Sequence, residues 1–139
     1  MLNRLFINPW RFRIWRRKIY KKVFKADKTY FVLNSTSTSN KIVTNAIVAP
    51  GDLILYDRNN HKSICHGALI QGGGIPLYLE TSRNPYGSIG GIYEQCFKEE
   101  YIPNLIKEKC REKAELKRPI RLAIIELGTY EGVISNANR

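Results

Sequence analysis

Five consecutive hydroxylated residues, Ser35–Ser39, stand between a short apolar segment and a helical apolar pattern, Thr38–Val48. The first backbone N–H groups of a helix lack partners within the helix, and the helix dipole adds about half a positive charge there. Hydroxyl donors beside those amides would hold a phosphate from both sides. The pattern therefore predicts an anion site at the start of this helix. The alternative is that Thr36 or Thr38 acts only as an N-cap, a position that Ser and Thr favour in any helix.

His61 is the second residue that could do chemistry, because it follows the apolar segment Leu53–Tyr56 within a polar run, Asp57 to Lys62. An imidazole at this position can stack on a planar ligand or act as an acid or base. The alternative is a surface-loop histidine without a ligand. Three glutamates that end or follow apolar segments are further candidate bases, and nothing in the sequence singles one out: Glu80, Glu126 and Glu131.

These residues need a scaffold that brings the helix start and His61 together. Four apolar segments are predicted to be strands, near residues 30–33, 53–56, 75–79 and 121–126. Helical patterns occupy most of the intervals, at Thr38–Val48, Lys62–Gln71 and Phe97–Glu115, the last with a break expected near Pro103. The remaining interval, Thr81–Gly91, is predicted to be a turn-rich loop. This alternation is typical of an α/β fold with a mostly parallel sheet of about four strands and flanking helices. Ligands bind such sheets at the carboxyl ends of the strands, where the hydroxyl run and His61 both lie.

Two common nucleotide-binding motifs are absent from the sequence. A dinucleotide-binding motif needs GxGxxG directly after the first strand, where this chain has hydroxylated residues, and no GK[ST] ending of a phosphate-binding loop occurs. A phosphate site built from Ser and Thr suits a small phosphorylated cofactor better than ATP or NAD.

The positive charge of the chain lies mainly in its N-terminal arm. Of the formal net charge of +11, about +9 belongs to residues 1–28, which carry ten Lys/Arg and one acid, and about +2 belongs to the remainder. A basic helix is predicted over Arg11–Lys25, with an apolar stripe formed by Phe12, Trp15, Ile19 and Val23. Such a helix can bind nucleic acid or an anionic membrane, or it can pack its stripe on a neighbouring element. We treat residues 1–22 as a basic amphipathic arm and residues 23–139 as one domain.

The cysteines and the hydropathy pattern indicate a cytoplasmic protein. Three cysteines without CxxC spacing, Cys65, Cys96 and Cys110, argue against a disulfide framework or a metal site. No apolar run approaches the 18 residues of a membrane-spanning helix.

Several segments together resemble the bacterial ornithine decarboxylases of the Orn/Lys/Arg decarboxylase family, which depend on pyridoxal 5'-phosphate and have the aspartate-aminotransferase (type I) fold. The resemblance covers about Val23–Asn138 and is carried by TYFVLNSTSTSNKIVTNA, DRNNHKS, TSRNPYG and RPIRLAIIELGTYEGVISNA. It implies an incomplete cofactor-binding large domain, preceded by an unmatched basic helix. It also implies a place in polyamine biosynthesis, where the intact enzymes, which are lyases, convert ornithine to putrescine and CO2.

The resemblance assigns roles to four residues of this chain. Thr36, Ser37 and Thr38 match the turn that holds the cofactor phosphate, and His61 matches the histidine that stacks on the pyridine ring. Four positions depart from the family pattern: Ser35 replaces glycine, Ile64 and Cys65 replace Asn and His, and Asn138 replaces arginine.

The resemblance assigns no catalytic residue to this chain. The lysine that forms an imine with the cofactor, and the aspartate that pairs with the pyridine nitrogen, belong to family segments that this sequence does not contain. We therefore expect the chain alone to be inactive and to bind the cofactor weakly or not at all. We also expect a homo-oligomer or a complementing fragment as partner, and only the fragment could supply the missing groups.

Overall fold

The computed structural model describes residues 9–126, 128–129, 132 and 134, and the side chains of residues 9–13, 15 and 16 are outside this description. The chain divides into two compact units, one through Ser35 and the other from Thr36. Of the residues discussed above, Glu131 and Asn138 lie outside the described residues, and so do the side chains of Phe12 and Trp15.

The first unit contains the predicted basic helix, α1, which spans Pro9–Val23. The ring of Tyr20 stacks on Phe24 with centroids 5.9 Å apart and meets Phe31 edge to face at 5.3 Å. No acidic residue lies in the first turn of α1, and Lys21 and Lys22 occupy its last turn, where cations complement the helix dipole.

The strand predicted at residues 30–33 is wrong, because residues 28–32 have no regular secondary structure. A strand requires a neighbour to complete its hydrogen bonds. Tyr30 and Leu33 are 67% and 85% exposed, and Phe31 packs on Tyr20. The apolar run thus has the composition of a buried strand, but no neighbouring strand pairs with it among the described residues.

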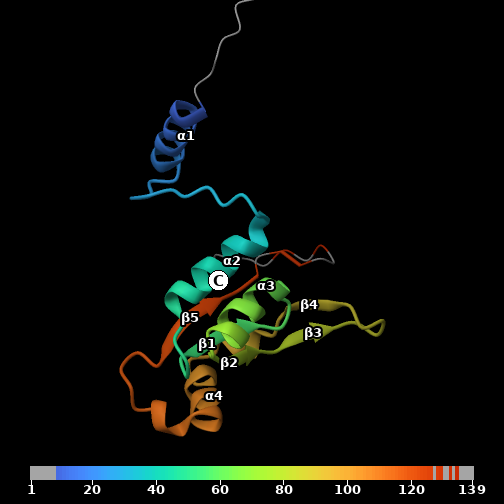
Figure 1. The fold of residues 1–139 in the computed structure, drawn as a ribbon. Coiled ribbons are helices and arrows are strands. Elements are labelled where there is room, and N and C mark those ends of the chain that lie inside the picture. Colours follow the sequence, from blue (N-terminus) through green and yellow to red (C-terminus); the bar gives the residue numbers. More distant parts are fainter. Residues whose placement is uncertain (1–8, 127, 130–131, 133, 135–139) are drawn as a thin grey trace, which may run out of the picture. The chain divides into compact units, whose positions relative to one another are not determined.

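The second unit is built on a parallel sheet of three strands: β1 Leu53–Asp57, β2 Ile75–Leu79 and β5 Ile120–Ile124. The strand order is β2-β1-β5, and both pairings are parallel, so the other three predicted strands are confirmed. All five residues of β1 are buried, which explains why this segment is apolar throughout until Asp57. Figure 1 shows β1 between its two neighbours.

Helices cover the two faces of this sheet (Figure 1). On one face, Leu53 and Leu55 of β1 pack in a core with residues from η2 Glu94–Phe97 and α4 Tyr101–Lys109. On the other face, Ile54 packs with Val48, which follows α2 Ser35–Ile47, and with Ala68. Ala68 belongs to η1 Cys65–Gln71, a π-helix that continues the short helix α3 Lys62–Ile64. The predicted helices at residues 38–48 and 62–71 are therefore confirmed.

Two predicted elements differ in detail. The charged helical stretch is divided into η2, α4 and η3 Arg111–Lys113, with the first interruption at residues 98–100 and not at Pro103. Pro103 is the third residue of α4, where its missing N–H would have had no partner within the helix. The predicted loop at residues 81–91 contains an antiparallel hairpin of β3 Thr81–Arg83 and β4 Ile89–Ile92.

Helix α2 and the π-helix η1 approach each other closely at Gly67. A Cβ added to this buried glycine would overlap the hydroxyl of Thr44 and lie 3.1 Å from the Cα of Lys41. A rotation of the Thr44 side chain to make room would break a hydrogen bond, because its hydroxyl donates to the carbonyl of Asn40 over 2.8 Å. The glycine therefore sets the spacing between the two helices that flank the candidate site.

We expect Gly67→Ala to destabilise the chain by about 1–3 kcal/mol, because the added methyl forces α2 and η1 apart. Gly91→Ala is the matched control, since a Cβ there meets nothing within 4 Å. Thermal denaturation followed by circular dichroism at 222 nm should show a lower apparent midpoint for the first variant only. Equal midpoints for the two variants would contradict the close approach at Gly67.

Candidate functional site

The carboxyl ends of β1 and β5 are joined by the side chain of Asp57, which is 1% exposed. Its Oδ1 accepts a hydrogen bond from the N–H of Asn59 over 2.9 Å, and its Oδ2 accepts one from the N–H of Glu126 over 2.6 Å. Asn60 adds a third link, because its Nδ2 donates to the carbonyl of Ile124 over 2.9 Å. These bonds hold the loop after β1 against the end of β5 and shape the edge of the sheet.

His61 follows this loop and caps helix α3. Its Nδ1 accepts a hydrogen bond from the N–H of Ser63 over 3.2 Å and lies 2.8 Å from the Oγ of the same residue. The Oγ of Ser63 also accepts from Nδ2 of Asn40 on α2, over 3.0 Å. His61 is therefore a half-buried, hydrogen-bonded residue that is connected to α2, and not an isolated surface histidine.

The hydroxyl run occupies the start of α2, as the sequence predicts. The helix begins at Ser35, so Thr36 and Thr38 lie within its first turn and neither is the N-cap. Thr36 is exposed, while Ser37 and Thr38 are half-buried. No acidic residue occupies this turn to compete with an anion. Ser35 has φ +72°, a left-handed conformation that glycine adopts without steric cost, so the departure from glycine leaves strain in the turn.

A hollow of about 330 Å³ lies beside His61 at the carboxyl ends of β1 and β5. The described residues that line it are Asn59, His61, Glu126, Gly128 and Thr129. The Nδ2 of Asn59 is buried without a hydrogen-bond partner among the described residues, so it is available to a ligand. The hydroxylated residues at the start of α2 do not line this hollow, and their link to His61 is the hydrogen bond from Asn40 to Ser63.

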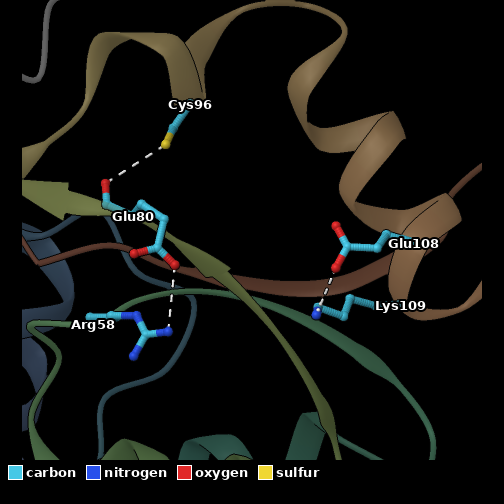
Figure 2. Close-up of polar contacts among 5 residues, drawn as sticks. All are labelled: Arg58, Glu80, Cys96, Glu108 and Lys109. Carbon is cyan, nitrogen blue, oxygen red and sulfur yellow. Dashed lines mark hydrogen bonds and ion pairs between the residues drawn. The ribbon is translucent and has the colours of Figure 1, made fainter.

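Of the two candidate bases that the structure describes, Glu80 and Glu126, only Glu126 lines the hollow. Glu80 instead forms an ion pair with Arg58 over 3.5 Å, and its carbonyl accepts a hydrogen bond from the thiol of Cys96 over 3.7 Å (Figure 2). Arg58 also lies 4.9 Å from the ring centre of Tyr78 on β2. Glu80 thus belongs to a set of contacts between β2 and η2, whereas Glu131 lies outside the described residues.

Two tyrosines near these groups stay neutral at physiological pH. Burial raises the pKa of Tyr56, at the end of β1, above its ordinary range. A hydrogen bond with Cys96, together with burial, raises the pKa of Tyr101 to about 12. Neither phenol would act as an anionic base near pH 7.

Sequence patterns alone did not single out Asp57, Asn40, Ser63 or Asn59. The sequence did offer one signal for Asp57, which is its position at the end of an otherwise apolar strand. A carboxylate buried at such a position needs hydrogen-bond partners. No local signal marked Asn40 or Ser63, because they are 23 residues apart and meet only through the packing of α2 on α3.

A parallel sheet flanked by helices, with His61 as the N-cap of the helix that follows β1, defines an α/β domain. The family profile described as "Orn/Lys/Arg decarboxylase, major domain" matches residues 16–139, and the chain belongs to this family. The predicted family membership is therefore confirmed. Among the described residues, no helix is long and apolar enough to cross a membrane.

Relatives named ornithine decarboxylase are more similar to this chain than an inducible lysine decarboxylase is. The Haemophilus influenzae protein is 63% identical over 123 residues, which cover 88% of this chain and 17% of that protein. The inducible ornithine decarboxylase of Escherichia coli is 63% identical over 118 residues, covering 85% and 16%. The inducible lysine decarboxylase of E. coli is 38% identical over 117 residues, covering 84% and 16%. This chain therefore spans less than a fifth of the length of each.

A solved structure supports the fold. Lysine decarboxylase A from Pseudomonas aeruginosa superposes with a TM-score of 0.70 at 41% identity, over 86% of this chain and 16% of that one. The predicted fold class, part of the α/β domain of pyridoxal-phosphate-dependent transferases, is confirmed.

Replacement of Asp57 should be the most damaging change at this edge. We expect Asp57→Ala to cost about 2–4 kcal/mol, because it leaves two buried N–H groups without a charged acceptor. Asp52→Ala is the matched control: Asp52 also accepts from a backbone N–H, that of Ala49 over 2.9 Å, but this bond is exposed. The control should cost less than about 1 kcal/mol. Urea denaturation followed by circular dichroism gives both values, and comparable losses would exclude the role assigned to Asp57.

Proposed function

We propose that this chain forms part of the pyridoxal-phosphate site of an ornithine decarboxylase. The observation that carries the proposal is the hydrogen-bonded connection between His61 and the helix whose first turn holds Thr36, Ser37 and Thr38. A phosphorylated aromatic cofactor needs an anion site and a flat contact surface at a fixed separation. The start of α2 would provide the anion site and His61 the flat surface, and the bonds from Asn40 to Ser63 and from Ser63 to His61 connect the two.

The chain's residues fit such a cofactor in three respects. The first turn of α2 offers backbone N–H groups and hydroxyls without an acidic residue. The half-buried imidazole of His61 offers a ring face for stacking. The buried Nδ2 of Asn59 and the carboxylate of Glu126 add polar groups to the hollow beside it.

Each of these residues binds or orients, and none carries the bond-breaking step. Bound pyridoxal phosphate supplies the electron sink that stabilises the electron pair left when CO2 departs. The first turn of α2 would hold the phosphate, and His61 would fix the plane of the ring. Ornithine is the proposed substrate because the ornithine decarboxylases named above share 63% of aligned residues, against 38% for the lysine enzyme.

The proposal also retains the expectations about partners. A complementing fragment would supply the catalytic lysine and the group that pairs with the pyridine nitrogen. A second copy of the chain lacks both groups, so a homo-oligomer is a separate prediction. Binding of nucleic acid or an anionic membrane by the basic arm stays a prediction. In its favour, Ile14, Val23 and Phe24 are 53%, 66% and 70% exposed in a segment rich in Lys and Arg.

Titration of the purified chain with pyridoxal phosphate tests the site. We expect weak binding that falls by about tenfold or more in Thr36→Ala with His61→Ala, since each residue contributes about 1 kcal/mol or more. His66→Ala is the control, because His66 is exposed and lies outside the hollow. The bound fraction is read from equilibrium dialysis, since surface lysines such as Lys41 or Lys62 can form imines that absorb light. Equal affinity for all three proteins would refute the assignment.

The purified chain should release no CO2 from ornithine in the presence of pyridoxal phosphate. Its sequence does not contain the family lysine that links covalently to the cofactor, and neither Lys41 nor Lys62 matches that position. Release of 14CO2 from carboxyl-labelled ornithine is the measurement, with an intact ornithine decarboxylase as positive control. Labelled gas above the background of heat-denatured chain would show that another group performs this role.

A further inference from the structure

Three residues from two elements form a continuous hydrogen-bonded chain: Asn40 on α2, Ser63 on α3 and His61 at the cap of α3. The chain runs from the helix that carries the proposed phosphate turn to the proposed ring-stacking residue. Ser63 is 3% exposed, so water does not compete with its bonds.

Two groups in this hydrogen-bonded series can only donate, and they determine the direction of each bond. The N–H of Ser63 only donates, so Nδ1 of His61 must be the acceptor of the 3.2 Å bond. The Nδ2 group of Asn40 also only donates, so the Oγ of Ser63 accepts over 3.0 Å. The hydroxyl hydrogen of Ser63 is then free to point at Nδ1, which is 2.8 Å away. Nδ1 receives two donors, and a neutral ring carries its proton at Nε2.

We propose that Asn40 and Ser63 are positioning residues that fix the tautomer and the ring plane of His61. The consequence for the cofactor site rests on the proposed function. Two donors at one ring nitrogen restrict rotation about the Cβ–Cγ bond, so the face offered for stacking has one orientation. Because Asn40 directly follows the hydroxyl run and lies about one turn after Thr36 on the same helix, it couples the position of the ring to that of the phosphate turn.

If Asn40 only held α2 in place, Asn45 on the same helix would have the same role. Asn45 also lies on α2 and also crosses to the following helix, where its Nδ2 donates to Oε1 of Gln71 over 3.1 Å. That bond is exposed and does not involve His61. Comparison of variants at Asn40 and Asn45 therefore distinguishes an effect on the packing of α2 from an effect on the orientation of the imidazole.

The test is the protonation state of Nδ1 in the full chain, measured by 15N NMR with labelled histidine. The sequence has two histidines, and His66→Gln assigns the signals. Wild type should show an unprotonated Nδ1 on His61. In Asn40→Asp a carboxylate replaces the amide donor and accepts from the hydroxyl of Ser63. The Oγ of Ser63 then accepts from His61 at the expense of the 3.2 Å bond from the N–H of Ser63, and the Nδ1 signal should move toward the protonated position.

Asn45→Asp places the same charge on the same helix and should leave the signal unchanged. Asn40→Asp combined with Ser63→Ala breaks the connection and should restore the unprotonated signal. The proposal is overturned by a wild-type signal that shows a protonated Nδ1 or the tautomer mixture of a free imidazole. It is also overturned if Asn40→Asp has no effect, if Asn45→Asp has the same effect, or if the double variant keeps the shift.

A second measurement connects the positioning role to the cofactor. Ser63→Ala should weaken pyridoxal-phosphate binding by about tenfold, with retained helical circular dichroism, whereas Asn45→Ala should not weaken it. If wild type binds no cofactor, the proposed function fails while the NMR result still decides the roles of Asn40 and Ser63. If wild type binds and Ser63→Ala binds equally well, the positioning role in the cofactor site fails alone.

Discussion

The buried carboxylate of Asp57 is the constraint on which the site depends. A charge that is 1% exposed is tolerable only when its oxygens are fully engaged, and here two backbone N–H groups from distant segments engage them. The same contacts that satisfy the carboxylate bring the loop after β1 to the end of β5. His61 and Glu126 line one hollow as a result.

Helix α2 contributes through a second set of contacts, which connect Asn40 to the histidine through Ser63. The absence of a side chain at Gly67 allows α2 to approach η1 closely, and this approach places Asn40 within hydrogen-bond distance of Ser63. Packing, and not sequence proximity, therefore determines where the hydroxyl run lies relative to the imidazole. A π-helix at this crossing fits the general association of such segments with functional sites.

The sequence predicted the elements whose signal is local. β1 is a continuous apolar run bounded by turn residues, and its burial on both faces accounts for that run. Residues 30–33 carry the same local signal, yet they form no strand, because strand formation is decided by pairing with other segments. The roles of Asp57 and Asn40 depend on partners 69 and 23 residues away, so no pattern within a short window reveals them. His61 was found because a histidine after a strand is conspicuous, but its hydrogen-bond partners were not.

The strand order β2-β1-β5 also determines the sequence of events during synthesis. β1 and β2 are close in the chain and can pair early, since closing a short loop costs little entropy. β5 contacts β1 across more than 60 residues, as in the 64-residue separation between Asn60 and Ile124. Until the ribosome has released that segment, one edge of the central strand, which is apolar from Leu53 through Tyr56, stays open to other chains. Such an edge is a template for intermolecular pairing, and its exposure lasts for as long as translation of the intervening segment takes.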